Sequence, residues 1–131
     1  MIWKADYETG ISLIDEQHKK LVGMLTELSS TDEPINEVTG KVIKEMVEYV
    51  KVHFRDEEEI MKRIRYPEYH GHKKLHQDLV HEIAEILVSL KNGKEITNLE
   101  LKSFLERWLI DHILMEDRRI GLFLGSTPMA A

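Results

Sequence analysis

The chain has 131 residues, which suits one domain spanning residues 1–131 and is enough to bury a hydrophobic core without disulfides or a structural metal. Its 24 acidic residues outnumber its 18 basic ones and give a net charge of −6, which argues against a surface that binds nucleic acid or an anionic membrane. It contains no cysteine, which excludes disulfides, thiolate zinc sites and cysteine-ligated iron–sulfur clusters.

The sequence has no pattern typical of a targeting or membrane segment. Residues 1–10 lack the charged-then-apolar order of a signal peptide, and no apolar run is long enough to span a bilayer. We therefore expect a cytoplasmic protein without membrane insertion.

Apolar residues recur at helical spacing in four stretches, which short segments containing Pro, Gly, Asn or Ser separate. The first helix is expected over about residues 11–29. The second is expected to start near Pro34 and Asn36 and to end at Pro67. No strand-like alternation competes with this interpretation.

The second half of the chain repeats the pattern. A third helix is expected from about Glu68 to the Asn92–Gly93 pair, and a fourth from a cap at Thr97 or Asn98, with a tail from Gly121 onward. The pattern predicts an all-α protein, an antiparallel up-down-up-down four-helix bundle with an N-terminal arm and a short C-terminal tail.

Counting residues along neighbouring helices tests the register of this bundle. The number of residues from His76 to the turn near Asn92 is nearly the same as the number from Thr97 to His112. These two histidines should therefore lie at one level of the bundle. The numbers of residues from Glu57 and from His72 to the turn between them agree less well. We therefore expect residues 65–71 to form an extended connector that drops back along the bundle.

Five of the seven histidines lie on the apolar stripes of the predicted helices: His18, His53, His72, His76 and His112. The pairs His53/Glu57 and His72/His76 are each four residues apart, so their side chains can converge on one centre. A polar side chain costs roughly 1–3 kcal/mol when it is buried without a partner. Five histidines directed into one core therefore predict a metal centre as their common partner.

Two other histidines fail this test. His70 should point away from His72. His81 and Glu85 have the right spacing but lie among charged residues on a solvated face. Both are expected to have plain surface roles, so spacing alone is weak support for a metal site.

Neighbouring acidic residues compete for the role of carboxylate ligand at both motifs. The apolar stripe favours Glu57 over Glu58 and Glu59. After His112, ideal helix geometry favours Glu116, which is four residues on, over Asp117, which is five residues on and roughly 140° away.

The number of candidate ligands limits the kind of metal site. Five histidines and two carboxylates are too many for one tetrahedral zinc or one facial-triad iron, and they suit two metals bridged by carboxylates. Iron with this nitrogen-rich ligation is best suited to reversible chemistry with O2.

At this point the chain resembles the hemerythrin family, specifically its single-domain bacterial members. The resemblance covers the whole chain. It rests on Asp15-Glu16-Gln17-His18, His53-Phe54-x2-Glu57, His72-x3-His76 and His112-x4-Asp117. The last motif of that family implies Asp117, and not Glu116, as the ligand.

The resemblance implies a non-haem di-iron centre with an oxo or hydroxo bridge. Glu57 and Asp117 would bridge the irons. One iron would take three histidines, His72, His76 and His112. The other would take His18 and His53 and keep an open position, where O2 binds end-on and is held as hydroperoxide after a two-electron transfer. The implied function is oxygen transport or storage by reversible O2 binding, and not enzyme catalysis.

Other functions remain in competition. A sensor of O2, redox state or iron would have to act through a separate partner, because the sequence offers no output domain. A di-iron oxidase is disfavoured, because such sites use a Glu-x2-His motif and no histidine here follows a glutamate by three residues. A zinc protease is excluded by the missing His-Glu-x2-His. We expect a monomer whose partner is O2, delivered to an unidentified O2-consuming protein.

Overall fold

The computed structural model describes residues 3–28 and 30–126, apart from the side chains of Ile113 and Ser126. These residues form α1 (Ser12–Thr26), α2 (Glu37–Arg63), α3 (Tyr69–Lys91), α4 (Asn98–Asp111), η2 (His112–Asp117) and α5 (Arg118–Ser126), preceded by the short 3-10 helix η1 (Ala5–Tyr7). The part of the chain described here contains no β-strand, only an isolated bridge between Pro34 and Thr97.

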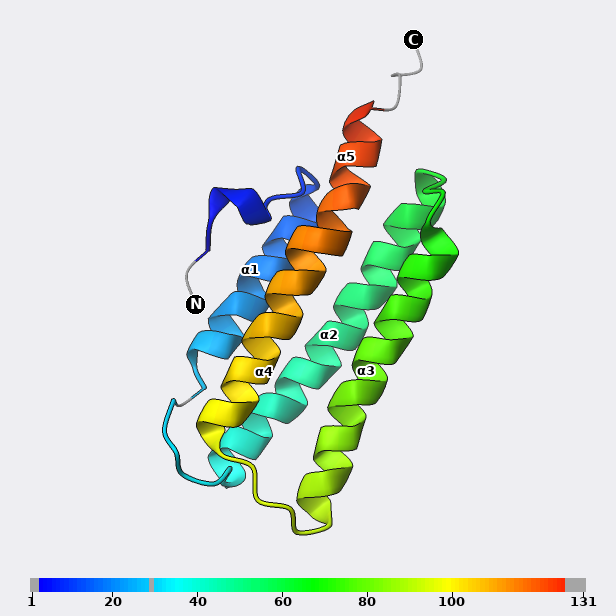
Figure 1. Cartoon of the computed structure of the whole chain (residues 1–131). Helices are drawn as coiled ribbons and strands as arrows, with labels where there is room; N and C mark the ends of the chain where they lie inside the picture. The colour runs from blue at the N-terminus through cyan, green and yellow to red at the C-terminus, as the bar shows by residue number, and fades with distance from the viewer. Residues whose placement is uncertain (1–2, 29, 127–131) are drawn as a thin grey trace.

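The helices form four rods, because α4, η2 and α5 follow one another without a break. Figure 1 shows the rods side by side and alternating in direction along the chain. The predicted antiparallel four-helix bundle is confirmed. Among the residues that the structure describes, no helix has both the length and the apolar character needed to cross a membrane.

Local signals start the helices where the sequence placed them. The Asn36 side chain caps α2 by accepting a hydrogen bond from the Thr39 backbone N–H at 3.0 Å. The Thr97 hydroxyl caps α4 in the same way, at 3.1 Å from the Glu100 backbone nitrogen. The first helix is shorter than expected, since α1 ends at Thr26, and Ser29 lies outside the described residues.

The predicted tail from Gly121 is wrong as far as Ser126. Residues 121–126 continue α5, and residues 127–131 lie outside the described part. The helix continues because Ile120 is fully buried against Met61 and Tyr66, with Phe123 packed beside them. This contact gives the last helix an apolar face to bury.

The predicted extended connector over residues 65–71 is also wrong. Gly71 lies inside α3, and the link from α2 is only residues 64–68. Arg65 has a positive φ of 56°, and the Tyr66 backbone N–H bonds back to the Met61 carbonyl at 2.9 Å. This is a Schellman turn, which reverses the chain so tightly that α3 begins at the level where α2 ends.

The N-terminal arm is fastened to α1. The carboxylate of Asp15 accepts hydrogen bonds from the backbone N–H and the hydroxyl of Thr9, both at 2.8 Å. Tyr7 is buried in the larger hydrophobic core. The arm predicted from the sequence is therefore a packed part of the fold.

Two apolar clusters divide the interior along the bundle axis. Along α2, Val50 and Phe54 belong to the larger cluster and Met61 to a smaller one, with Glu57 between them. Polar side chains buried at this level are thus sealed by hydrophobic packing on both sides.

Candidate metal centre

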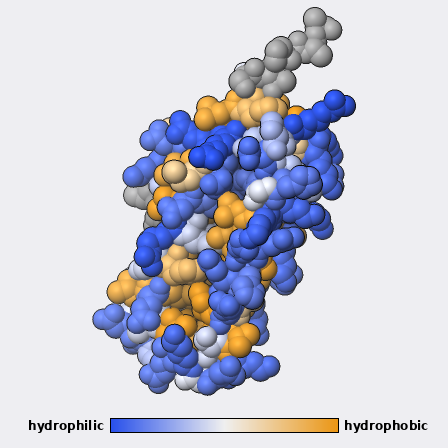
Figure 2. Space-filling model, turned by 45° about the vertical axis from the view of Figure 1, so that its right-hand side comes forward, coloured by the Kyte–Doolittle hydropathy of each residue, from blue (hydrophilic) through white to orange (hydrophobic). Residues whose placement is uncertain are grey.

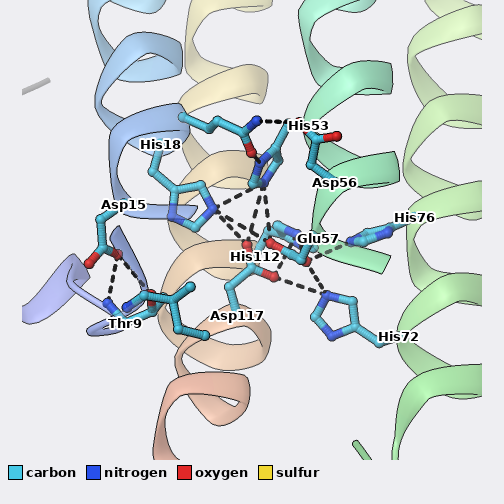
Figure 3. A network of polar contacts seen from close by, with 12 residues as sticks. Thr9, Asp15, His18, His53, Asp56, Glu57, His72, His76, His112 and Asp117 are labelled. Carbon is cyan, nitrogen blue, oxygen red and sulfur yellow. Dashed lines mark hydrogen bonds and ion pairs between the residues drawn. The ribbon is translucent and has the colours of Figure 1, made fainter. Parts of the chain in front are cut away.

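Seven polar side chains meet inside the bundle at one level, contributed by all four rods. They come from α1, from α2, from α3, and from the two ends of η2, and each residue is at most 4% exposed. They are His18, His53, Glu57, His72, His76, His112 and Asp117. Figure 3 shows their imidazole rings and carboxylates pointing toward one another.

The seven divide into two overlapping groups of atoms, each within 4.8 Å of one another. Glu57 and Asp117 belong to both groups. Three histidines, His72, His76 and His112, complete one group, and His18 and His53 complete the other. The structure therefore brings together every residue that the sequence analysis selected.

Each carboxylate turns one oxygen toward each group. Glu57 Oε1 lies 2.7 Å from His72 Nε2, whereas Glu57 Oε2 lies 3.3 Å from His53 Nε2. Asp117 Oδ1 lies 2.8 Å from His112 Nε2, whereas Asp117 Oδ2 lies 2.7 Å from His18 Nε2. This is the arrangement in which two carboxylates can bridge two cations.

The donor atoms fit cations better than they fit one another. His18 Nε2 and His53 Nε2 lie 3.1 Å apart, although both rings direct the same kind of nitrogen into the cluster. Glu57 Oε2, Asp117 Oδ1 and His112 Nε2 are buried without a well-directed hydrogen bond, although Asp117 Oδ1 and His112 Nε2 lie only 2.8 Å apart. A buried polar atom without a partner costs about 1–3 kcal/mol, so the arrangement suits metal ions, which accept several such ligands at once.

The cluster favours positive charge between the two carboxylates. Burial alone would raise the pKa of Asp117, but the His112 charge and hydrogen bonds from the histidines hold that pKa well below its usual range. The pKa of Glu57 is lowered in the same way, against burial and the Asp117 charge, by hydrogen bonds from His112, His72 and His76. Both carboxylates therefore stay ionised, as metal ligands must.

The imidazoles respond in the opposite sense. Burial would lower the pKa of His72, but hydrogen bonds to Asp117 and Glu57 raise it to about 9. Burial would also lower the pKa of His112, but the Asp117 charge and hydrogen bonds to Asp117 and Glu57 raise that pKa to about 10. Metal ions entering the cluster would take the place of these protons.

The helix widens where the last carboxylate enters the site. Residues 112–117 form a π-helix, in which backbone hydrogen bonds span five residues instead of four. Asp117 is fully buried in the cluster, whereas Glu116 is only half-buried and lines a cavity between α3 and α4. Ideal α-helix spacing favours Glu116, but the helix is not ideal here, and the structure places Asp117, the residue that the resemblance implies, in the cluster.

The family follows from a sequence match over most of the chain. Residues 9–122 match the family model described as Hemerythrin HHE cation binding domain. The chain belongs to the hemerythrin family. Hemerythrins carry a non-haem di-iron centre, and the two groups of ligand atoms described above are placed to hold one.

Several relatives extend this match. The chain is 34% identical over 119 residues to a bacteriohemerythrin of Stenotrophomonas maltophilia (strain R551-3), covering 90% of this chain and 77% of the relative. It is 30% identical over 128 residues to the bacteriohemerythrin of Methylococcus capsulatus (strain ATCC 33009 / NCIMB 11132 / Bath), covering 96% and 98%. A crystal structure of wild-type hemerythrin matches the fold with a TM-score of 0.84 at 29% identity, covering 96% and 98%.

In this hemerythrin, two residues that the sequence analysis did not select hold the cluster histidines from outside. His53 Nδ1 donates to Gln17 Oε1 at 2.7 Å, and the Gln17 amide donates to Asp56 Oδ2 at 2.8 Å. His76 Nδ1 donates to Glu58 Oε2 at 3.0 Å. With a hydrogen fixed on Nδ1, each ring is left with Nε2 as the nitrogen whose lone pair a metal ion in the cluster would bind.

A sequence signal for one of these residues exists. Gln17 lies on the buried side of α1, three residues after Ile14, and it is 6% exposed. A glutamine in that position needs a polar partner inside the bundle. No comparable signal marks Glu58, which lies beside Glu57 and Glu59 in a run of three glutamates.

The two histidines that were expected to have surface roles, His70 and His81, lie outside the cluster. His70 is exposed. The His81 side chain is 74% exposed and lies 3.0 Å from Glu85 in a surface ion pair. The spacing of His81 and Glu85 therefore places them together, but far from the buried cluster.

Proposed function

We propose that this hemerythrin binds O2 reversibly at two iron ions and serves as an oxygen carrier or store. His72, His76 and His112 would hold one iron, and His18 and His53 the other. The observation that carries the proposal is the division of each carboxylate between the two groups, with one oxygen facing each. Glu57 and Asp117 would therefore bridge the irons.

The two groups differ in the number of residues that they offer. The group that contains His18 has four members, and the group that contains His72 has five. The smaller group would leave a coordination position free for O2, and the bound iron pair would supply the electrons that O2 binding requires. O2 would therefore bind on the side of the cluster formed by His18 and His53.

The protein's own residues would keep such binding reversible by excluding water. The Phe54 ring stacks on the His76 imidazole with ring centres 3.8 Å apart and planes inclined by 5°. The same Phe54 ring also lies against His53, on the side where O2 would bind, with ring centres 5.7 Å apart. A dry, apolar surround limits access of water and protons to the bound oxygen.

Iron analysis and one visible spectrum test this proposal. We expect about two iron ions per chain, as seven ligands shared by two cations require. A visible absorption band should appear when O2 is admitted to the reduced protein and fade when O2 is removed. A colourless protein holding a single zinc ion would contradict the proposal.

A further inference from the structure

A cavity of about 440 Å³ opens between α2 and α3, and His76 is one of its lining residues. Phe54 and Val80 line its apolar part, and Tyr69 stands at its side. The volume lies within the usual range for small-molecule sites, about 300–1,000 Å³. Nothing in the proposed O2 chemistry uses this cavity.

The cavity is basic in an acidic protein. Its ionisable residues other than His76 and Tyr69 are four basic and two acidic ones, Lys51, Arg55, Lys62, Lys73, Glu58 and Glu59. These six residues give the lining a net charge of +2, while the whole chain carries −6. A local positive field of this kind attracts anions that the protein as a whole would repel.

The four basic residues of the cavity differ in their neighbours. Lys51 lies 3.5 Å from Glu48 and Arg55 lies 3.7 Å from Asp56, so acids on the same helix partly offset both. Lys62 and Lys73 instead flank the Tyr69 ring, 5.7 and 6.0 Å from its centre. Lys73 also lies 4.0 Å from Glu58, at the limit of an ion pair.

The cavity lies one side chain away from the cluster. His76 lines it, and His76 Nε2 is 3.0 Å from Glu57 Oε1 on the other side of the ring. A second cavity, between α3 and α4, reaches His112 in the same way, but its ionisable residues besides His112 are Arg107 and three acids, Glu82, Asp111 and Glu116. Of these two routes to a proposed iron ligand, only the one between α2 and α3 favours an anion.

We propose that the cavity between α2 and α3 binds small anionic reductants and passes their electrons through His76 to oxidised iron. This proposal rests on the proposed function, since it needs iron at His76. An enediol monoanion such as ascorbate would lose two electrons, one to each of two ferric ions, and one proton to solvent. It would leave as the neutral vicinal diketone, and the protein would again be ready to bind O2.

The sign of the salt dependence tests the proposal. Ferric, iron-loaded protein is reduced anaerobically by ascorbate, and the rate is followed at increasing ionic strength. Attraction to the cavity predicts a rate that falls as salt rises, whereas repulsion by the net charge of −6 predicts a rate that rises. A rising rate would overturn the proposal.

Two double variants locate the effect. Lys62→Glu/Lys73→Glu should slow reduction by ascorbate about tenfold, the lower end of typical electrostatic steering. Lys44→Glu/Lys91→Glu makes the same change in charge on the same two helices, beside a different cavity between α2 and α3, and should have a smaller effect. Equal slowing of the two variants would show that net charge, and not this cavity, sets the rate.

Two further measurements separate binding from iron chemistry. Calorimetric titration with inorganic phosphate should detect binding to wild type and to the control variant, but not to Lys62→Glu/Lys73→Glu. Reduction by neutral hydroquinone should be similar in all three proteins; a selective loss in the cavity variant would indicate damage to the site instead. Iron content and the O2 spectrum are recorded first, so a failure of the proposed function is seen in wild type before the cavity is tested.

Discussion

The imidazole Nδ1 of His53 lies 2.7 Å from the amide oxygen of Gln17, and both side chains are buried. Because an amide oxygen only accepts hydrogen bonds, the hydrogen must be on Nδ1 of His53. The Gln17 amide group in turn donates to Asp56, so the amide cannot rotate without losing both bonds. The ring of a proposed iron ligand is thus held by a chain of two hydrogen bonds that ends at a partly exposed carboxylate.

Replacement of this amide should weaken iron binding. Gln17→Leu keeps the approximate size of the side chain but removes the acceptor for His53, and loss of such an outer partner typically costs 10–100-fold in metal affinity. Iron affinity is measured by competition with a chelator. Glu16→Leu makes a similar change at an exposed neighbouring position and should leave the affinity unchanged. Equal affinities for wild type and Gln17→Leu would show that the hydrogen bond does not position the ligand.

Histidines inside and outside the cluster should differ in their effect on iron content. His72→Ala removes a nitrogen that lies 2.7 Å from Glu57 and 3.0 Å from Asp117, and we expect the iron per chain to fall. His70→Ala and His81→Ala change exposed side chains and should keep full iron. Elemental analysis of the purified variants decides the point, and similar losses in all three would refute the assignment of the buried histidines as ligands.

The π-helix predicts which of two adjacent acids matters. Asp117→Ala removes the oxygens that lie 2.8 Å from His112 and 2.7 Å from His18, one on each side of the cluster. We expect loss of the paired site, seen as less than the wild-type iron content and no O2-dependent band. Glu116→Ala changes a half-buried side chain outside the cluster and should preserve both. A larger loss in Glu116→Ala than in Asp117→Ala would show that Glu116 is the ligand, as ideal helix spacing favours.

The sequence predicted the bundle and the cluster because both depend on repeated, local patterns. Apolar periodicity fixes which face of each helix is buried, so the five histidines on those faces were found together. The connector and the tail were wrong for a different reason. The turn at Arg65 contains no glycine, so the sequence gives no sign of the left-handed conformation there. Helix α5 is stabilised by Ile120 packing against Met61, which is distant in the sequence, so no local pattern predicts the contact.

The contact between the N-terminal arm and α5 is another feature that only the structure shows. A Cβ atom added at Gly121 would overlap the backbone carbonyl of Thr9. Gly121→Ala should therefore lower the free energy of unfolding by about 1–3 kcal/mol, as overpacking does. Gly23→Ala places the same methyl group on α1 in open space and should raise it by about 0.5–1 kcal/mol. Urea titration of the iron-loaded proteins measures both, and a stable Gly121→Ala variant would mean that the arm does not pack against α5.

Replacement of Arg65 by glycine should stabilise the protein. Its positive φ of 56° is unfavourable for a residue with a Cβ atom, and Arg65 occupies the position of the Schellman turn where glycine is preferred. Arg65→Gly removes the strain but makes the unfolded chain more flexible, so the expected gain in the free energy of unfolding is roughly 0.5–1 kcal/mol. Arg63→Gly, at the last residue of α2, should instead lower the free energy of unfolding by up to about 1 kcal/mol, because glycine is a poor helix former. Urea titration of the two variants compares them directly, and destabilisation by both would show that the turn between α2 and α3 does not require the left-handed conformation at residue 65.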